Sequence, residues 1–415
     1  MHLVVINTVI GGDEHTVEGY IKRVSQLQPD LIAISCMSPH WYPLEPYLQA
    51  VDVNFSQTPV LIGGYQPILS PEQTIAHPAV DYICVGDGEI PTATLIQRLR
   101  GEGEGIVPGL WEKSPSGEII KSAPVLTDDL SKMPLPDYTI YEEKGSLHGL
   151  GLSMFGPKKL FILPVMTGRG CPYRCTYCCN TPLLEMWRGK GKYIRKYEPE
   201  RLIDELCQLR DRYGVDYFEF WDELFLANMK FAYHFLELYK KHINLPFSIN
   251  SRVEKMDEKF CYTAKEAGCH TIWFGIESGS EHYRIKNIGR KMTNEQIIIA
   301  AENARQVGIQ CLTFNIIGMP FETREHMLET LEINKTIRPE FFFFWPYIPL
   351  RGTPLYDVAK KAGLLLEQAV GNYIEGAIKG KLKLKVHEGG VTETEFKEIC
   401  SLMQQFQQEN NRLAL

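Results

Sequence analysis

The chain has 415 residues, of which 44% are hydrophobic and 23% charged, and its formal net charge at pH 7 is −7. No apolar run approaches the ~20 residues that a membrane-spanning helix needs. The acidic balance disfavours a general nucleic-acid binder, which needs clustered Lys and Arg to replace phosphate counterions. At roughly 100–200 residues per domain, we expect two or three domains in a cytoplasmic protein without a membrane span or a nucleic-acid partner.

Residues 1–105 alternate short apolar runs with helical segments. The apolar runs lie at 3–10, 29–36, 58–64 and 81–86. Strands this uniformly apolar, separated by helices, predict a Rossmann-like parallel sheet covered on both faces. Ser70, followed by Pro71 and Gln73, predicts a helix start with a capping box.

Residues 106–158 are rich in Gly and Pro, lack strong periodicity and are predicted to form a linker. The alternation resumes at 159, with apolar strands predicted near 160–166, 216–221, 246–250, 271–276, 310–317 and 341–347. Strands separated by helices in this number predict an incomplete, open (β/α)6 barrel over residues 159–350. Thr293 with Gln296 predicts another capping box, and residues 351–415 are predicted to form a mostly helical region.

Four of the eleven cysteines fall within the stretch GRGCPYRCTYCCN, residues 168–180. Cys171, Cys175 and Cys178 follow the first predicted barrel strand, at the rim where parallel barrels carry their active sites. Three thiolates on one loop can hold three irons of a cubane 4Fe–4S cluster and leave the fourth iron open to another ligand. A structural zinc site is the alternative, although zinc normally takes four protein ligands. We expect Cys179, next to Cys178, to pack without ligating.

The spacing C-x3-C-x2-C, with Tyr177 before the last cysteine, resembles the signature of the radical S-adenosylmethionine (SAM) superfamily. The likeness continues through FEFWDELF, SINSRVE, FGIESGS and FNIIGMP, residues 218–320. It implies that SAM is bound by Tyr177, by Asp222 or Glu223 at its amino group, by Arg252, by Glu277 at its ribose, and by Ile316 and Gly318 beside adenine. Asp222 and Glu223 could instead cap the next helix, and Arg252 could instead form a surface salt bridge.

The first hundred residues resemble the cobalamin-binding domain that precedes the barrel in one branch of this superfamily. The likeness implies cobalamin contacts at the C-terminal edge of the sheet, from Ser35, Ser38, Gly63, Gly64, Gly86 and Glu89. His15 is a poor match for a cobalt ligand, because the glycine that should follow it, Gly19, comes one position late. The chain begins near the family's second strand, so a domain that serves only as scaffold is the alternative.

The resemblance implies that an electron from the cluster cleaves SAM to a 5′-deoxyadenosyl radical. The leading hypothesis is a cobalamin-dependent methyltransferase acting on an unactivated carbon of a small-molecule or peptide substrate. A flavodoxin or ferredoxin is the expected reductant. The basic stretch 188–196 is expected to be an ordinary solvated face, and the alternative is a docking site for such an acidic partner. The alternative is a radical SAM cyclisation, rearrangement or oxidation without methyl transfer, and a non-catalytic metal-binding scaffold is the remote one.

Overall fold

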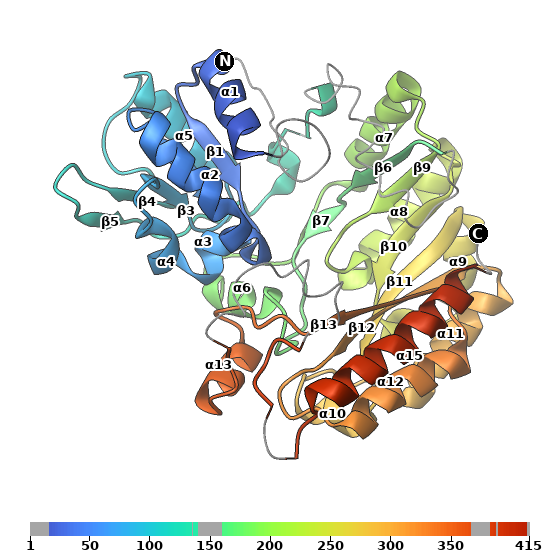
Figure 1. Ribbon diagram of the computed structural model, residues 1–415. Helices are drawn as coiled ribbons and strands as arrows, with labels where there is room; N and C mark the ends of the chain where they lie inside the picture. The colour runs from blue at the N-terminus through green and yellow to red at the C-terminus, as the bar shows by residue number, and fades with distance from the viewer. Residues whose placement is uncertain (1–15, 135, 140–159, 367–381, 387–388, 413–415) are drawn as a thin grey trace.

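The computed structural model describes residues 16–134, 136–139, 160–366, 382–386 and 389–412 (Figure 1). The strand predicted at 3–10 and His15 lie outside the described residues. Two α/β domains share this part of the chain, and the cysteine loop lies between them.

The N-terminal domain is built on a five-stranded sheet of order β1-β2-β3-β4-β5. Its elements are α1 (Val17–Leu27), β1 (Ile32–Ser35), α2 (Trp41–Asn54), β2 (Val60–Gly63), α3 (Tyr65–Leu69), α4 (Pro71–Ile75), β3 (Tyr82–Cys84), α5 (Glu89–Leu99), β4 (Leu110–Lys113) and β5 (Ile119–Lys121). Strands β1 to β3 are parallel. Leu61 packs with Leu95 of α5, whereas its neighbour Ile62 packs with Leu48 of α2, so helices cover both faces as predicted.

Two local predictions for this domain need correction. The sheet continues past the boundary predicted at residue 105, because β4 and β5 add to it as an antiparallel hairpin. Ser70 begins α4 without a side-chain capping bond, since the same residue also ends α3. The Gln73 side chain donates instead to the Tyr42 hydroxyl, at 3.3 Å.

The second domain is a six-stranded parallel sheet of order β13-β12-β11-β10-β9-β6, an open barrel as predicted. Its strands are β6 (Ile162–Val165), β9 (Tyr217–Phe220), β10 (Phe247–Ser251), β11 (Cys269–Glu277), β12 (Gln310–Ile317) and β13 (Phe341–Pro346). Its helices are α7 (Pro199–Tyr213), α8 (Met229–His242), α9 (Glu258–Glu266), α10 (Glu281–Lys286), α11 (Asn294–Gln306) and α12 (Arg324–Ile337). The capping box predicted at Thr293 and Gln296 is present at the start of α11.

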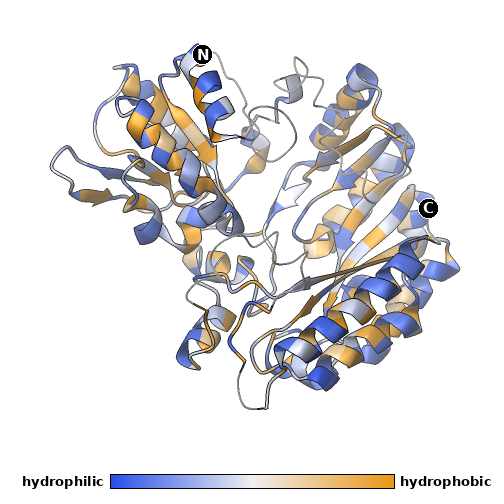
Figure 2. Cartoon of the chain, viewed as in Figure 1, coloured by the Kyte–Doolittle hydropathy of each residue, from blue (hydrophilic) through white to orange (hydrophobic). Residues whose placement is uncertain are grey.

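The two faces of the barrel strands differ in character because successive side chains point to opposite faces. On β9, Phe220 packs edge-on against Phe235 of α8, with ring centroids 5.3 Å apart. Glu219, the residue before Phe220, therefore faces the inside of the barrel. Figure 2 shows the helices with hydrophobic and hydrophilic bands around strands in which apolar residues predominate.

The C-terminal region contains α13 (Pro354–Lys361) and the long helix α15 (Glu393–Arg412). Helix α15 protects the edge strand β13, whose Phe342 N–H donates to Asn411 at 2.9 Å and whose Phe342 carbonyl accepts from Gln407 at 2.8 Å. These bonds satisfy backbone groups that a bare sheet edge would leave unpaired. Within the described residues, no helix is both long enough and apolar enough to cross a bilayer.

Candidate active site

The cysteine loop begins on the short strand β7 (Gly168–Arg169), which pairs antiparallel with β8 (Arg195–Lys196). Both glycines of the GRG sequence are required by this close approach. A side chain at Gly168 would collide with the Arg195 carbonyl oxygen, and one at Gly170 (φ +95) with the Tyr193 carbonyl oxygen. The loop ends where α6 (Asn180–Met186) begins, directly after Cys179.

Hydrogen bonds from distant segments hold the middle of the loop. The Thr176 N–H donates to the Ile288 carbonyl at 3.2 Å, and the Thr176 hydroxyl donates to the Asn287 carbonyl at 2.9 Å. The Thr176 carbonyl accepts from the Leu355 N–H at 2.9 Å. The loop is therefore fixed by the segment after α10 and by the start of α13.

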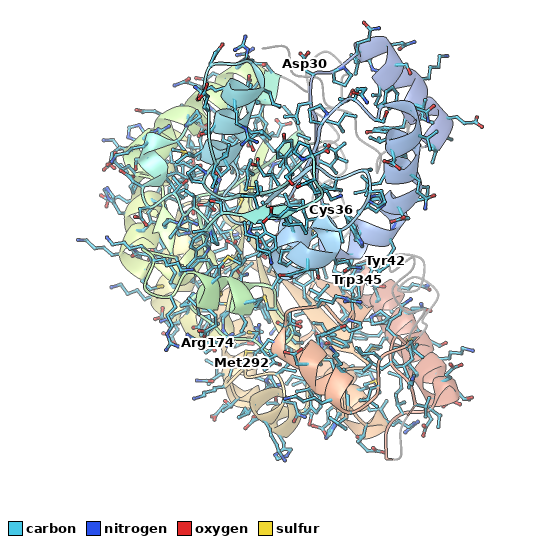
Figure 3. All side chains as sticks on the ribbon, turned by 90° about the vertical axis from the view of Figure 1, so that its left-hand side faces the viewer. Asp30, Cys36, Tyr42, Arg174, Met292 and Trp345 are labelled. Atoms are coloured by element: carbon cyan, nitrogen blue, oxygen red, sulfur yellow. The ribbon has the colours of Figure 1, made fainter. Side chains whose placement is uncertain are left out.

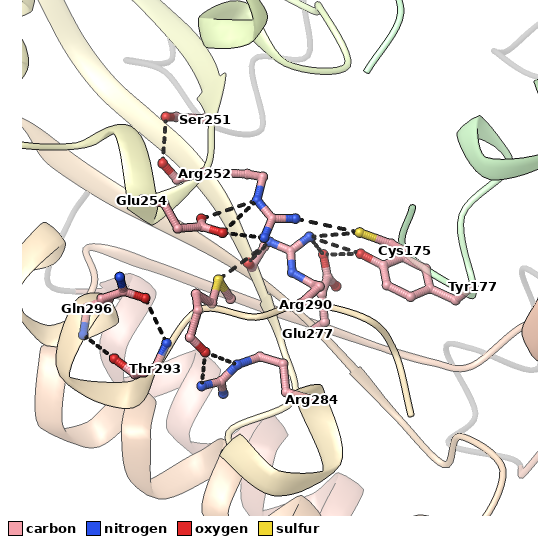
Figure 4. A network of polar contacts seen from close by, with 12 residues as sticks. Cys175, Tyr177, Ser251, Arg252, Glu254, Glu277, Arg284, Arg290, Thr293 and Gln296 are labelled. Atoms are coloured by element: carbon pink, nitrogen blue, oxygen red, sulfur yellow. Dashed lines mark hydrogen bonds and ion pairs between the residues drawn. The ribbon is translucent and has the colours of Figure 1, made fainter. Parts of the chain in front are cut away.

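The three predicted iron ligands have different surroundings. The Cys175 sulfur is buried and accepts from Arg252 Nη1 at 3.6 Å and from Arg290 Nη1 at 3.9 Å (Figure 4). The Cys178 sulfur accepts from Asn180 Nδ2 at 3.7 Å. Donors directed at sulfur atoms suit thiolates, which is the form that ligates iron. The surroundings of these sulfurs thus fit a cluster, and Cys171, Cys175 and Cys178 stay its predicted ligands.

The Cys179 thiol affects the protonation of the neighbouring Cys178 thiol. A hydrogen bond between the two thiols lowers the pKa of Cys178 and raises that of Cys179. Burial raises the pKa of Cys171 to about 11. Among the described residues, no three His, Cys, Asp or Glu side chains gather closely enough to hold a single metal ion.

Glu277, at the end of β11, forms the centre of a buried polar group. Its carboxylate accepts from the Tyr177 hydroxyl at 2.8 Å and lies 3.5 Å from Arg290 Nη1. Its backbone has φ +68, a left-handed conformation that is uncommon for a residue other than glycine and that recurs at functional sites. The side chain folds back over Gly275, where any Cβ would collide with the Glu277 carboxylate. Burial raises the pKa of Glu277.

Asp222 and Glu223, the two candidates for the SAM amino group, are used differently. Asp222 is buried and accepts from the Thr167 N–H at 2.9 Å, from the Thr167 hydroxyl at 2.6 Å and from Lys196 Nζ at 2.6 Å. The carboxylate of Glu223 accepts from the Gly170 N–H at 3.1 Å. Asp222 therefore has partners within the protein that a ligand would have to displace.

Arg252 is a buried residue, so it does not form a surface salt bridge. Its guanidinium is hydrogen-bonded to the carboxylate of Glu254, with Nε 3.2 Å from each oxygen. The same group lies over the Tyr173 ring, 3.7 Å from its centroid. These contacts fix the side chain while one nitrogen reaches Cys175.

Ile316 and Gly318, predicted to lie beside adenine, have distinct surroundings. Ile316 is half-buried and packs in a cluster with Tyr177 and Tyr347. Gly318 (φ +75) faces the C-terminal region, because a side chain there would meet Phe396 of α15 at 2.8 Å. Packing against Phe396 thus accounts for a glycine at position 318 without any ligand.

The residues predicted to contact cobalamin divide into two sets. Ser35, Ser38 and Gly63 lie at or just beyond the C-terminal ends of β1 and β2; Ser35 is exposed, and the Ser38 hydroxyl is a buried group without a hydrogen-bond partner among the described residues. A side chain at Gly63 would have its nearest neighbour at 4.0 Å, so the chain leaves room there. An unpaired hydroxyl and an uncrowded glycine at this edge of the sheet suit a polar ligand tail.

The other set makes contacts within the protein. A side chain at Gly64 (φ +87) would meet the Cys36 carbonyl at 2.7 Å, and one at Gly86 (φ +129) would meet the Trp187 ring at 3.1 Å. Glu89 forms an ion pair with Arg169 of β7. For Gly64, Gly86 and Glu89, contacts within the protein therefore account for the residue type without a ligand.

Ion pairs and packing join the N-terminal domain to the cysteine loop. Arg169 lies 3.3 Å from Asp87 as well as contacting Glu89, and Arg195 of β8 also pairs with Asp87. Tyr65 packs with Trp187 at the end of α6. In Figure 3, Tyr42 of the N-terminal domain and Trp345 of β13 both lie at the seam between the domains.

Several residues of this site escaped the sequence analysis, namely Arg169, Lys196, Glu254, Arg284 and Arg290. Each is a charged residue in a loop or in a helix or strand of at most six residues, where a charge is normally solvated. Arg169 lies in GRGCPYRCTYCCN, Glu254 in SINSRVE and Lys196 in the basic stretch 188–196, but the sequence predicts no role in the site for any of the three. No local pattern distinguishes these residues from surface charges.

An open parallel barrel with three cysteines after its first strand defines an iron–sulfur protein with its cluster at the barrel rim. Residues 165–333 match the family model of the radical SAM superfamily, and residues 5–96 match that of the B12 binding domain. The chain belongs to the radical SAM superfamily, in the branch that carries an N-terminal B12-binding domain.

The relatives and solved structures agree with this assignment. The chain is 30% identical to an uncharacterized methyltransferase of Pyrococcus horikoshii, over 85% of this chain and 74% of that protein. It is 25% identical to cytidylyl-2-hydroxyethylphosphonate methyltransferase of Streptomyces wedmorensis, over 72% of this chain and 60% of that one. The fold is similar to that of the cobalamin-dependent SAM radical enzyme OxsB, solved with aqua-cobalamin and SAM bound, with TM-score 0.67, 18% identity and coverage of 97% and 66%.

Family membership confirms the cofactors predicted from the sequence, a 4Fe–4S cluster, SAM and cobalamin. It also confirms that the chain is a radical SAM enzyme, a class that acts on small molecules and needs a reductant.

Proposed function

We propose that this chain methylates an unactivated carbon of a small-molecule or peptide substrate. The observation that carries the proposal is the junction between the domains. Arg169, two residues before Cys171, forms ion pairs with Asp87 and Glu89 beyond the end of β3. A methyl carrier bound at that sheet edge would face the barrel rim, and both relatives compared above are named methyltransferases.

When bound, the cluster supplies the electron that cleaves SAM, and cobalamin supplies the methyl carrier. The chain's own residues bind and orient the cofactors and the substrate, and they exclude water. Cys171, Cys175 and Cys178 would each hold one iron. Glu223 is a better candidate than Asp222 for the SAM amino group, because the Asp222 carboxylate is already bonded to Thr167 and Lys196.

The reductant we propose is a cytoplasmic flavodoxin or ferredoxin. Arg188, Lys190 and Lys192 are exposed on the segment between α6 and β8, close in sequence to the cysteine loop. Clustered positive charge favours encounter with an acidic partner.

The test is anaerobic reconstitution with iron, sulfide, cobalamin and SAM, followed by reduction. We expect 5′-deoxyadenosine from the wild type and none from the triple variant Cys171→Ala, Cys175→Ala, Cys178→Ala. Cys207→Ala, which alters a half-buried thiol on α7, is the matched control. SAM cleavage by the triple variant would refute radical chemistry at this loop.

Methyl transfer needs its own measurement. With the true substrate, S-adenosylhomocysteine should form together with 5′-deoxyadenosine and a product heavier by one methylene. Production of 5′-deoxyadenosine with a converted substrate but no S-adenosylhomocysteine would favour cyclisation, rearrangement or oxidation, with the N-terminal domain as scaffold.

A further inference from the structure

Arg290 reaches the Cys175 sulfur from a loop outside every motif of the sequence analysis. It lies between α10 and α11 and is 5% exposed. Besides Cys175, its guanidinium contacts the Gly275 carbonyl, and Nη1 lies 3.2 Å from the Tyr177 hydroxyl. Its Nε is buried and has no hydrogen-bond partner among the described residues.

The loop that carries Arg290 is held rigidly by a second arginine. Arg284 is fully buried and donates to the Ser278 carbonyl at 2.6 Å and to the Met292 carbonyl at 3.0 and 3.2 Å (Figure 4). The Arg290 N–H donates to the Arg284 carbonyl at 3.1 Å. These bonds, together with those from Thr176, leave Arg290 little freedom to turn away from the sulfur.

Arg252, directly after β10, approaches the same sulfur, so two guanidinium groups from separate segments meet at one predicted ligand. Within the described part of the chain, no arginine is hydrogen-bonded to the sulfur of Cys171 or Cys178. The three iron ligands are therefore unequal, because both guanidinium donors are directed at Cys175. Each guanidinium also pairs with a carboxylate, Arg252 with Glu254 and Arg290 with Glu277.

Hydrogen bonds to cluster sulfurs and nearby charge set the reduction potential of an iron–sulfur cluster. A reduced cluster carries one more negative charge than the oxidised form. A cationic donor at a ligand sulfur therefore stabilises the reduced form and eases the entry of the electron.

We propose that Arg290 is a positioning residue which, with Arg252, holds the Cys175 thiolate and raises the reduction potential of the cluster. The inference rests on the proposed function only in that it needs the cluster to assemble. It concerns the step before SAM is cleaved and is independent of what is methylated.

The test is an EPR-monitored redox titration of reconstituted wild type and Arg290→Gln, without SAM. At a fixed solution potential, we expect the ratio of reduced to oxidised cluster to be about tenfold lower in the variant, equivalent to ~59 mV for one electron. Arg305→Gln, which removes an equal charge at the C-terminal end of α11, should titrate like the wild type.

A purely structural role for Arg290 would change thermal stability or iron content and leave the potential of the loaded protein unaltered. If Arg290→Gln fails to assemble a cluster, Arg290→Lys and Arg252→Gln are titrated instead. Lysine keeps the positive charge but has one nitrogen in place of the two guanidinium nitrogens that contact Gly275, Tyr177 and the sulfur, so a smaller decrease in the same direction is expected.

A wild-type potential in every loaded variant of Arg290 and Arg252 would overturn the inference. That result, together with normal SAM cleavage, would leave the proposed function intact. Failure of the wild type to bind iron would instead reject the proposed function.

Discussion

The Tyr177 hydroxyl donates to Glu277 Oε1 at 2.8 Å, joining the cysteine loop to the end of β11 across 100 positions of sequence. This bond links the first motif of the radical SAM core to the carboxylate implied to contact the SAM ribose. The position of that carboxylate therefore depends on the cysteine loop. Substitution of either residue should alter the position of the other side chain.

We expect Tyr177→Phe to weaken SAM binding and to destabilise the fold. The substitution removes the hydroxyl donor from a buried carboxylate, and such a loss costs about 1–3 kcal/mol. Urea denaturation and equilibrium dialysis with SAM would measure the two effects. Tyr262→Phe, at an exposed tyrosine on α9, is the matched control. Equal stability and equal SAM affinity in the two variants would show that the Tyr177–Glu277 hydrogen bond contributes to neither property.

Asp222→Asn and Glu223→Gln should separate folding from ligand binding. Asp222 and Lys196 form a buried ion pair with side chains 2% and 8% exposed, and removal of one partner of such a pair typically costs about 3–5 kcal/mol. We therefore expect Asp222→Asn to lower the free energy of unfolding. Glu223→Gln should keep the stability and weaken SAM binding. The opposite pattern in denaturation and SAM titration would exchange the two assignments.

Glu322, between β12 and α12, should make stability depend on pH. It is fully buried, and burial raises its pKa from 4.5 to about 8, so the folded chain favours the protonated form. The unfolded chain binds fewer protons in this range, and stability should fall as pH rises from about 4.5 to 8, by on the order of 1 kcal/mol per pH unit.

Glu322→Gln should remove this slope while keeping an acceptor for the Met319 N–H, which Glu322 binds at 3.1 Å. The measurement is urea denaturation of the apoprotein at several pH values on both sides of neutrality. If the free energy of unfolding depended on pH equally in the wild type and the variant, Glu322 would not be the source of the slope.

Arg169→Ala should loosen the hold of the N-terminal domain on the cysteine loop. The side chain is 28% exposed, so solvent screens its pairs with Asp87 and Glu89, and we expect a loss of about 1 kcal/mol. Cobalamin affinity should fall roughly fivefold, measured by the absorbance of the bound cofactor. Arg98→Ala, which breaks a pair with Glu112 inside the N-terminal domain, is the control. A fall of equal size in the control would mean that the contact between the domains is not responsible.

Cys179→Ala should keep the full iron content of the wild type after reconstitution, whereas Cys178→Ala should lose most of it. The reason is that Cys178 precedes Cys179 directly, and both thiols cannot easily reach the same cluster. Assays of bound iron and sulfide after reconstitution would measure the difference between the two variants. Loss of iron from Cys179→Ala alone would assign it a ligand role.

Much of the fold could be predicted because its signals are local. Apolar runs marked all six strands of the barrel sheet, and Thr293 with Gln296 marked the start of α11. The extension of the N-terminal sheet by β4 and β5 was missed, since an antiparallel hairpin after a Gly-rich segment has the local composition of a linker.

The sequence by itself determined the family, the open barrel and the three iron ligands to test, because motif spacing and apolar periodicity are short-range properties of the chain. Only the tertiary structure decided that Arg290 meets Cys175 across 115 positions, that Asp222 is bonded to Lys196, and that Glu89 pairs with Arg169. Each of these contacts depends on where loops from separate strands end, which packing sets. A charged side chain in a loop has the same local sequence whether its charge is buried against a thiol or left in water.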